Sequence, residues 1–250
     1  MHQPKIIQRL SAVFAAVALT LCCASFSSAA VTQLPAVQLT VNGNAVQLDA
    51  SLSFDDTFGV WLSDFQGAGN GWSVTNGHAS FVPDPFIDYG FSVKNLSAAA
   101  ETFTFTFSVP FSDGPYNVLD SSHTSGVTDG RPNPTGTVTV TPGSGFTFVH
   151  NPQVDGVFIA GSAISTGCAL TGTPGFSSSC QGGSFSTVTF GPTNAAGTLS
   201  VIVSFVVSPQ DIYNASGQVS LSAVPEPATG LALFAGMAVL FSVIARRRMS

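Results

Sequence analysis

Aspartates are the commonest ionisable side chains here, and four of them form two close pairs. Asp55 and Asp56 are adjacent, and Asp84 and Asp88 are separated by three residues. Glycosidases use two carboxyl groups about 5–10 Å apart, but adjacent strand residues such as Asp55 and Asp56 point to opposite faces. Ca²⁺ takes oxygen ligands, so either pair could instead hold calcium. The pattern leaves solvated turn acids and weak calcium sites as the two interpretations.

Three histidines, His78, His123 and His150, lie outside the terminal segments. Each lies beside turn residues, and none has a second His, Cys or carboxylate at the spacing of a zinc site. Only strands distant in sequence could assemble them into a site, so surface positions are predicted. The sequence also lacks a Gly-x-Ser-x-Gly elbow and a phosphate-binding glycine loop. We therefore expect no enzyme activity and no resident cofactor.

Two cysteines, Cys168 and Cys180, lie outside the N-terminal segment. An even number of cysteines in an exported chain is typical of a disulfide. The bond would close a loop rich in glycine and serine, a closure that chain-entropy models value at about 3 kcal/mol. A reactive or metal-binding thiol pair is disfavoured, because no histidine is close and the spacing is not Cys-x-x-Cys.

A group of aromatic residues surrounds Asp84 and Asp88 in the sequence. Exposed aromatic faces beside polar side chains would suit carbohydrate binding, whereas aromatic residues in a β domain also fill the core. Both interpretations are open for this group: Trp61, Trp72, Phe81, Phe86, Tyr89 and Phe91.

The charge of the chain is unevenly distributed. The formal net charge is −6, but between residues 31 and 224 the only basic residues are Lys94 and Arg131, against twelve acids, which gives about −10. Binding to phosphate backbones requires Lys and Arg. The central region is therefore not expected to bind nucleic acid.

The strand signal has a period of two. From Thr102 to Val109, hydroxyl and apolar residues alternate without a break, so Phe103, Phe105, Phe107 and Val109 should share the buried face. Pro110 is expected to end this strand. Asn42-Gly43 and Asn76-Gly77 are typical of tight turns.

Many short strands with regular turns predict a mainly β fold, an antiparallel sandwich or jelly-roll. Residues 121–134 are expected to form a polar loop. The remaining predicted strands are Val37–Val41, Ser51–Phe54, Trp72–Thr75, Phe86–Lys94, Gly136–Thr141, Gly145–His150, Val157–Ala160, Ser184–Phe190, Thr198–Val207 and Gly217–Leu221.

Residues 1–30 have the features of a secretory signal peptide. Lys5 and Arg9 precede an apolar run, and Ser28-Ala29-Ala30 supplies small residues before a cleavage point after Ala30. The general secretion machinery is therefore an expected partner.

The last 27 residues have three parts in a fixed order. Pro225-Glu226-Pro227 comes first, then the uncharged run Ala228–Ala245, then Arg246, Arg247 and Arg248. Eighteen helical residues span about 27 Å, enough for a transmembrane helix. The arginines place that end of the helix in the cytoplasm. A permanent C-terminal anchor is one interpretation of this pattern.

The same tail resembles the PEP-CTERM sorting signal of exported bacterial proteins. The resemblance rests on Val224, Pro225, Glu226 and Pro227, the helix 228–245 and the arginines. It implies recognition and cleavage near Pro-Glu-Pro by the membrane transpeptidase exosortase. It also implies release to the cell surface or to exopolysaccharide.

Three regions are thus expected: the signal peptide 1–30, the exported β domain 31–222 and the sorting signal 223–250. The expected function is that of a structural or interaction protein of the cell surface or extracellular matrix. A carbohydrate- or calcium-binding adhesion module is the alternative, and a secreted hydrolase is the third interpretation.

Overall fold

The computed structural model describes residues 33–112, 114–130, 136–172, 177–193 and 195–223. The predicted signal peptide with Ala30, and the tail from Val224 to the arginine cluster, lie outside these ranges. No helix in the described part of the chain has the length and apolar character of a membrane span.

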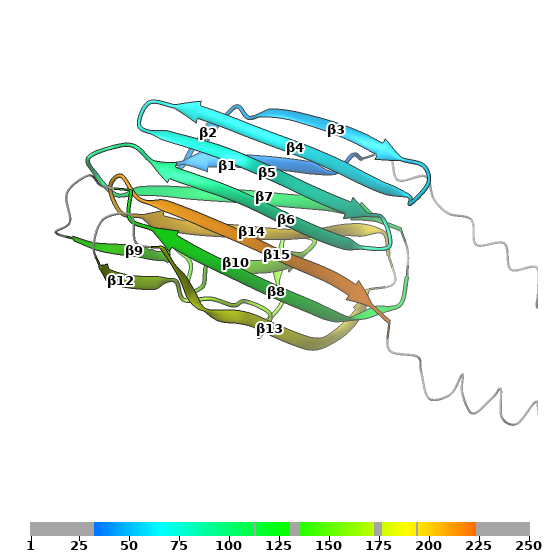
Figure 1. Cartoon of the computed structure of the whole chain (residues 1–250). Coiled ribbons are helices and arrows are strands. Elements are labelled where there is room, and N and C mark those ends of the chain that lie inside the picture. The colour runs from blue at the N-terminus through cyan, green and yellow to red at the C-terminus, as the bar shows by residue number, and fades with distance from the viewer. Residues whose placement is uncertain (1–32, 113, 131–135, 173–176, 194, 224–250) are drawn as a thin grey trace, which may run out of the picture. The chain divides into compact units, whose positions relative to one another are not determined.

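Two antiparallel sheets form the described fold (Figure 1). Sheet A contains β1 (Ala36–Val41), β2 (Asn44–Val46), β7 (Glu101–Phe111), β9 (Gly136–Pro142), β10 (His150–Val154), β11 (Val157–Phe158), β12 (Cys168–Gly172) and β14 (Gly197–Val207). Sheet B contains β3 (Asp49–Asp55), β4 (Val60–Gly69), β5 (Trp72–Val82), β6 (Phe86–Asn95), β8 (Tyr116–Thr128), β13 (Ser177–Thr193) and β15 (Ile212–Ser222).

Aromatic side chains from both sheets meet between them. Phe91 of sheet B stacks on Phe105 of sheet A with ring centroids 4.2 Å apart, and Tyr89 stacks on Phe107 at 4.6 Å. Burying such large rings contributes to the free energy that holds the sheets face to face. The predicted mainly β, sandwich-like architecture is confirmed.

Strand β7 has the predicted alternation but not the predicted end. Phe103, Phe105 and Phe107 are fully buried, as expected from the period of two. The strand continues through Pro110, which pairs with Thr198 of β14. The pairing of β7 with β1 stops at Ser108, so Pro110 lies beside only one described strand and needs no N–H for the other side.

The predicted polar loop at 121–134 is wrong in its first half, because residues 116–128 form β8, which lies between β13 and β15 in sheet B. Ser121, His123 and Ser125 are buried between the sheets, although a polar loop was predicted there. Strand β4 was also absent from the prediction, and Gly145–His150 is not a strand before His150. The Asn42-Gly43 turn is confirmed, with φ of 51° and 79°.

Strand β3 is an edge strand of sheet B, and sheet A does not fully cover the inner face of this strand. Leu52 and Phe54 are 38% and 45% exposed, although their alternation points them toward the core side, opposite Ser63 and Trp61 of β4. Asp49 and Asp55 stand at the two ends of this strand.

Candidate functional site

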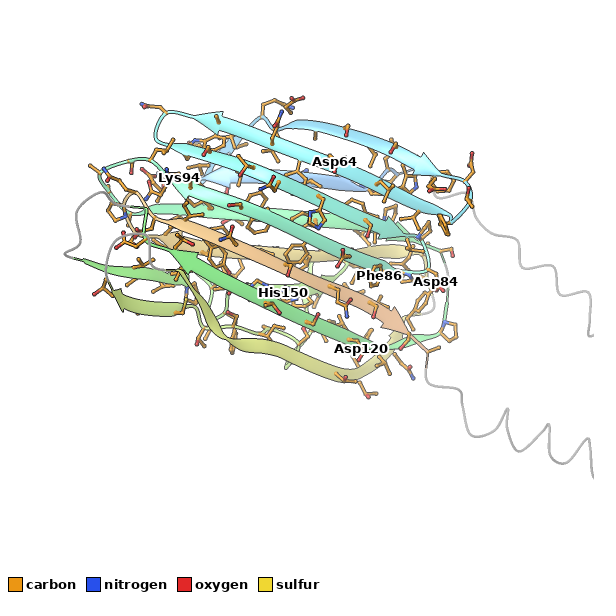
Figure 2. All side chains as sticks on the ribbon, viewed as in Figure 1. Asp64, Asp84, Phe86, Lys94, Asp120 and His150 are labelled. Atoms are coloured by element: carbon orange, nitrogen blue, oxygen red, sulfur yellow. The ribbon has the colours of Figure 1, made fainter. Side chains whose placement is uncertain are left out.

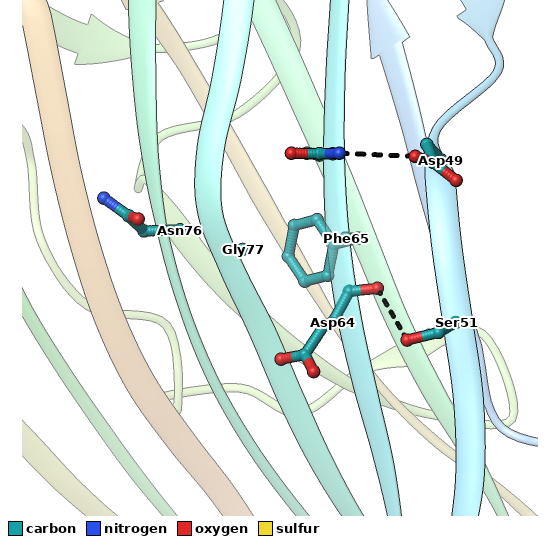
Figure 3. Close-up of a pocket in the computed structure, with 7 residues that line it drawn as sticks. Asp49, Ser51, Asp64, Phe65, Asn76 and Gly77 are labelled. Atoms are coloured by element: carbon teal, nitrogen blue, oxygen red, sulfur yellow. Dashed lines mark hydrogen bonds between the residues drawn. The ribbon is translucent and has the colours of Figure 1, made fainter.

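A polar groove of about 420 Å³ lies on the outer face of sheet B, over β3, β4 and β5 (Figure 3). This volume falls within the range of small-molecule sites. Exposed polar side chains line it together with Gly77 and the edge of the buried Phe65: Asp49, Ser51, Asp64, Gln66 and Asn76.

A β-bulge in β5 shapes this groove. Between the pairs Thr75–Ser92 and His78–Gly90, β5 has one residue more than β6, and the same extra residue shifts its register against β4. Asn76 adopts φ of 52°, the left-handed conformation that asparagine tolerates better than most residues. The Asn76-Gly77 pair was predicted as a hairpin turn, and this is wrong, because its positive φ serves a bulge inside a continuous strand.

Gly77 is required by the close approach of β4 at the bulge. A Cβ atom on Gly77 would collide with the carbonyl oxygen and the ring of Phe65. The missing side chain therefore lets Phe65 pack inward beneath the groove, while Asn76 turns outward.

Several polar atoms of the groove are available to a ligand. Gln66 Nε2 donates to an Asp49 carboxylate oxygen at 3.3 Å, and Ser51 Oγ donates to the Asp64 carbonyl oxygen at 3.5 Å. Within the described part of the chain, neither the Asp64 carboxylate nor the Asn76 amide has a partner. The arrangement can supply carboxylate, amide and hydroxyl groups to hydroxyl- or amine-bearing molecules.

The polar surface continues from the groove across sheet B (Figure 2). Asp64 lies opposite His78 in the β4–β5 ladder, and the His78 ring lies over Gly90. Partial burial raises the pKa of the neighbouring Asp88 carboxyl, while His78 acts in the opposite direction. Lys94 lies farther along β6 on the same face and does not line the groove.

The two aspartate pairs predicted as weak calcium sites lie on different strands and turns of sheet B. Asp55 accepts the Thr57 N–H at 2.9 Å in the turn after β3, and Asp56 is exposed beside it. Asp84 lies in the β5–β6 turn, and Asp88 lies on β6. Among the described residues, no group of three or more His, Cys, Asp or Glu side chains has the geometry to hold a metal ion. Calcium binding there stays a prediction.

The predicted aromatic surface is not formed by most of its members. Trp72, Phe81, Tyr89 and Phe91 are at most 6% exposed and belong to the core. Trp61 is half-buried, and its ring centroid lies 4.9 Å from that of Phe54 at the uncovered edge. The core interpretation therefore holds for these four side chains, because inward positions of β5 and β6 carry them.

A chain of hydrogen bonds lies buried between the sheets. The Tyr89 hydroxyl is 2.9 Å from His123 Nδ1 and 2.6 Å from His150 Nδ1. His150 Nε2 lies 2.8 Å from Ser121 Oγ, and His123 Nε2 lies 3.1 Å from the Tyr213 hydroxyl. His150 comes from sheet A and the other four from sheet B. The surface positions predicted for His123 and His150 are wrong, whereas His78 is exposed.

Two proton arrangements satisfy this chain with neutral groups. In one, Tyr213 donates to His123, His123 donates to Tyr89, Tyr89 donates to His150, and His150 donates to Ser121. In the other, every donor and acceptor role is reversed. Burial lowers the pKa of His123 to about 4, and burial together with His123 lowers the pKa of His150 well below its usual value. Burial likewise raises the pKa values of Tyr89 and Tyr213.

The bond from Ser121 to His150 has the length of a nucleophile–base contact. Both residues are fully buried, so no substrate reaches the Ser121 hydroxyl in this structure. The chain of bonds instead ties β10 of sheet A to β6 and β8 of sheet B, and satisfies polar groups that would be costly to bury unpaired.

The two predicted disulfide cysteines lie on strands that contact each other. Cys168 begins β12, and Cys180 lies within β13. The side chain of Cys180 lies outside the described residues. The disulfide therefore stays a prediction.

Comparisons with known proteins give no family for this chain. No family model and no curated protein matches it. Among solved structures, TmCBM61 in complex with β-1,4-galactotriose is 10% identical, with a TM-score of 0.23 over 70% of this chain and 89% of that one. The enzymatically active domain of tailspike protein 4 from bacteriophage CBA120 is 12% identical, with a TM-score of 0.24 over 76% of this chain and 20% of that one. At these TM-scores we take no function from either protein.

Proposed function

We propose that this protein is an exported surface or matrix protein whose β domain binds polysaccharide in the groove over β3, β4 and β5. The observation that carries the proposal is the outward grouping of Asp49, Ser51, Asp64, Gln66 and Asn76 around one cavity. Sugars present many hydroxyl groups, and these carboxylate, amide and hydroxyl side chains accept and donate hydrogen bonds to them. The role is binding rather than catalysis.

The surroundings of the groove support a binding role of moderate affinity. Phe65 is buried beneath it, so the groove offers polar contacts without an exposed aromatic platform. Each hydrogen bond to a ligand replaces one to water and contributes only about 1 kcal/mol. Long polymers that present the same unit repeatedly gain avidity from many copies of the protein on one surface.

Uncharged substitutions test the groove. Asn76→Gly, which keeps the left-handed conformation, or Gln66→Ala should weaken binding of the native host's polysaccharide by about fivefold, because each removes amide hydrogen bonds. Ser216→Ala is the matched control, since Ser216 is exposed on β15 of the same sheet outside the groove. Affinity electrophoresis or calorimetry measures the effect. Equal loss in the control, or no binding by the wild-type protein to any polysaccharide, would contradict the proposal.

The route to the surface is part of the proposal and rests on the terminal segments. The signal peptide 1–30 delivers the chain to the general secretion machinery, and the helix 228–245 holds it in the membrane until exosortase cuts near Pro225-Glu226-Pro227. What supports this is the order of the motif, apolar run and arginines in the sequence.

Mass spectrometry of the released protein tests the processing. The expected mature chain begins at Val31 and ends near Pro225–Pro227. An intact tail through Arg248, in a host with active exosortase, would show a permanent anchor instead.

A further inference from the structure

We infer that the groove selects polysaccharides that carry free amino groups, and that it disfavours polymers of uronic acids. The inference rests on the proposed function, because it names the class of sugar that the same groove would bind. It follows from which charges line the groove and how they are spaced.

The charges of the groove are of one sign. Asp49 and Asp64 line it, and no lysine, arginine or histidine does. In the described part of the chain Lys94 is the only lysine or arginine, and it lies outside the groove on β6. A uronate carboxylate placed here would meet like charges within the Debye length, about 8 Å at physiological ionic strength. An ammonium group would meet opposite charges.

The two carboxylates lie on the same face of the groove but on different strands. Asp49 lies opposite Gln66, and Asp64 lies opposite Ser51, so the two acids are diagonal neighbours on the same face of the β3–β4 ladder. Figure 3 shows the Asp64 carboxylate directed toward β5 and away from Asp49, so the two acids can accept from amino groups on different sugar units rather than from one ammonium. Gln66 and Ser51 occupy the other corners and can contact ring hydroxyl groups.

The free acceptors match the donors of an amine. An ammonium carries three N–H donors and no acceptor, and ionised carboxylates only accept. Because no described residue bonds the Asp64 carboxylate, it is available to accept a charge-assisted bond, which is stronger than a neutral one. N-acetylation of the sugar removes the charge and two of these donors, so it should remove this advantage.

Short oligomers of β-1,4-linked glucosamine, of β-1,4-linked N-acetylglucosamine and of α-1,4-linked galacturonate test the inference on the purified protein. The glucosamine oligomer should bind at least about tenfold more tightly than its acetylated form, since bonds to charged groups are worth more. Added salt should weaken the binding of the glucosamine oligomer alone. Asp64→Asn should bring its affinity to the level of the acetylated oligomer. Asp56→Asn, which removes the same charge in the exposed turn after β3, should change nothing.

The possible outcomes separate the two proposals. Equal affinity for the acetylated and free-amine oligomers, or preference for galacturonate, overturns the selectivity, while loss of binding in Asn76→Gly still supports the proposed function. An equal effect of Asp56→Asn and Asp64→Asn assigns the preference to overall acidity and also overturns the inference. If neither the oligomers nor the host polysaccharide binds, both proposals fail.

Discussion

Acidification should destabilise the folded protein by about 3 kcal/mol through His123 alone. Burial lowers the pKa of His123 from 6.5 in the unfolded chain to about 4 in the native state. Above pH 6.5 the imidazole is neutral in both states. Between these values the unfolded chain binds a proton that the native state does not, so stability falls as the pH falls, by about 1.4 kcal/mol per unit. His150 acts in the same direction.

Urea unfolding at a series of pH values measures this effect. The double variant His123→Gln/His150→Gln should be less stable at neutral pH, because its buried hydrogen-bond chain is broken. Its stability should also depend less on pH between about 6.5 and 4. Ser216→Ala is the control, since Ser216 is exposed on β15 and does not titrate, and it should keep the slope of the wild-type protein. An unchanged slope in the double variant would show that other groups cause the acid response.

Replacing Gly77 by alanine should cost about 2–3 kcal/mol of stability. The added methyl group collides with the Phe65 carbonyl oxygen and ring, and relieving that contact requires backbone movement in both β4 and β5. The register shift at the bulge and the floor of the groove should change together, so polysaccharide binding should weaken even at temperatures where the variant stays folded.

Gly90→Ala is the matched control for this substitution. Its methyl group would also meet a side chain at close range, but that side chain is the His78 ring, which is exposed and can rotate away. We expect a loss below about 1 kcal/mol from Gly90→Ala. Urea unfolding of the two variants measures their losses of stability. Equal losses in Gly77→Ala and Gly90→Ala would contradict the role given to the Phe65 backbone.

The sequence predicts the sandwich best where a strand has one apolar and one polar face. Strand β7 is the clearest case, because Phe103, Phe105 and Phe107 alternate with hydroxyl residues and are fully buried. The same rule fails for strand β8, which has polar side chains at buried positions. Ser121 bonds with His150, and His123 bonds with Tyr89. Because these partners are far away in the sequence, the residues around Ser121 and His123 give no sign of them.

The groove could have been found only in part from the sequence. In β5 the inward apolar positions change from Trp72 and Val74 to Ala79 and Phe81, which is a shift from even to odd numbers. Such a shift, with Asn-Gly between its halves, is the signal of a bulge within one strand rather than a turn between two. This shift does not predict which residues of the neighbouring strands lie beside Asn76, because those neighbours depend on how the strands pair.

The edge strand β3 has a consequence for the protein at high surface density. If two copies joined through this strand in antiparallel register centred on Leu52, Asp49 of each would face Asp55 of the other. Like charges directly opposite each other in a ladder are destabilising, and charged edges discourage sheet-to-sheet growth. The strand that exposes Leu52 and Phe54 thus carries charges that oppose antiparallel pairing with a second copy in this register.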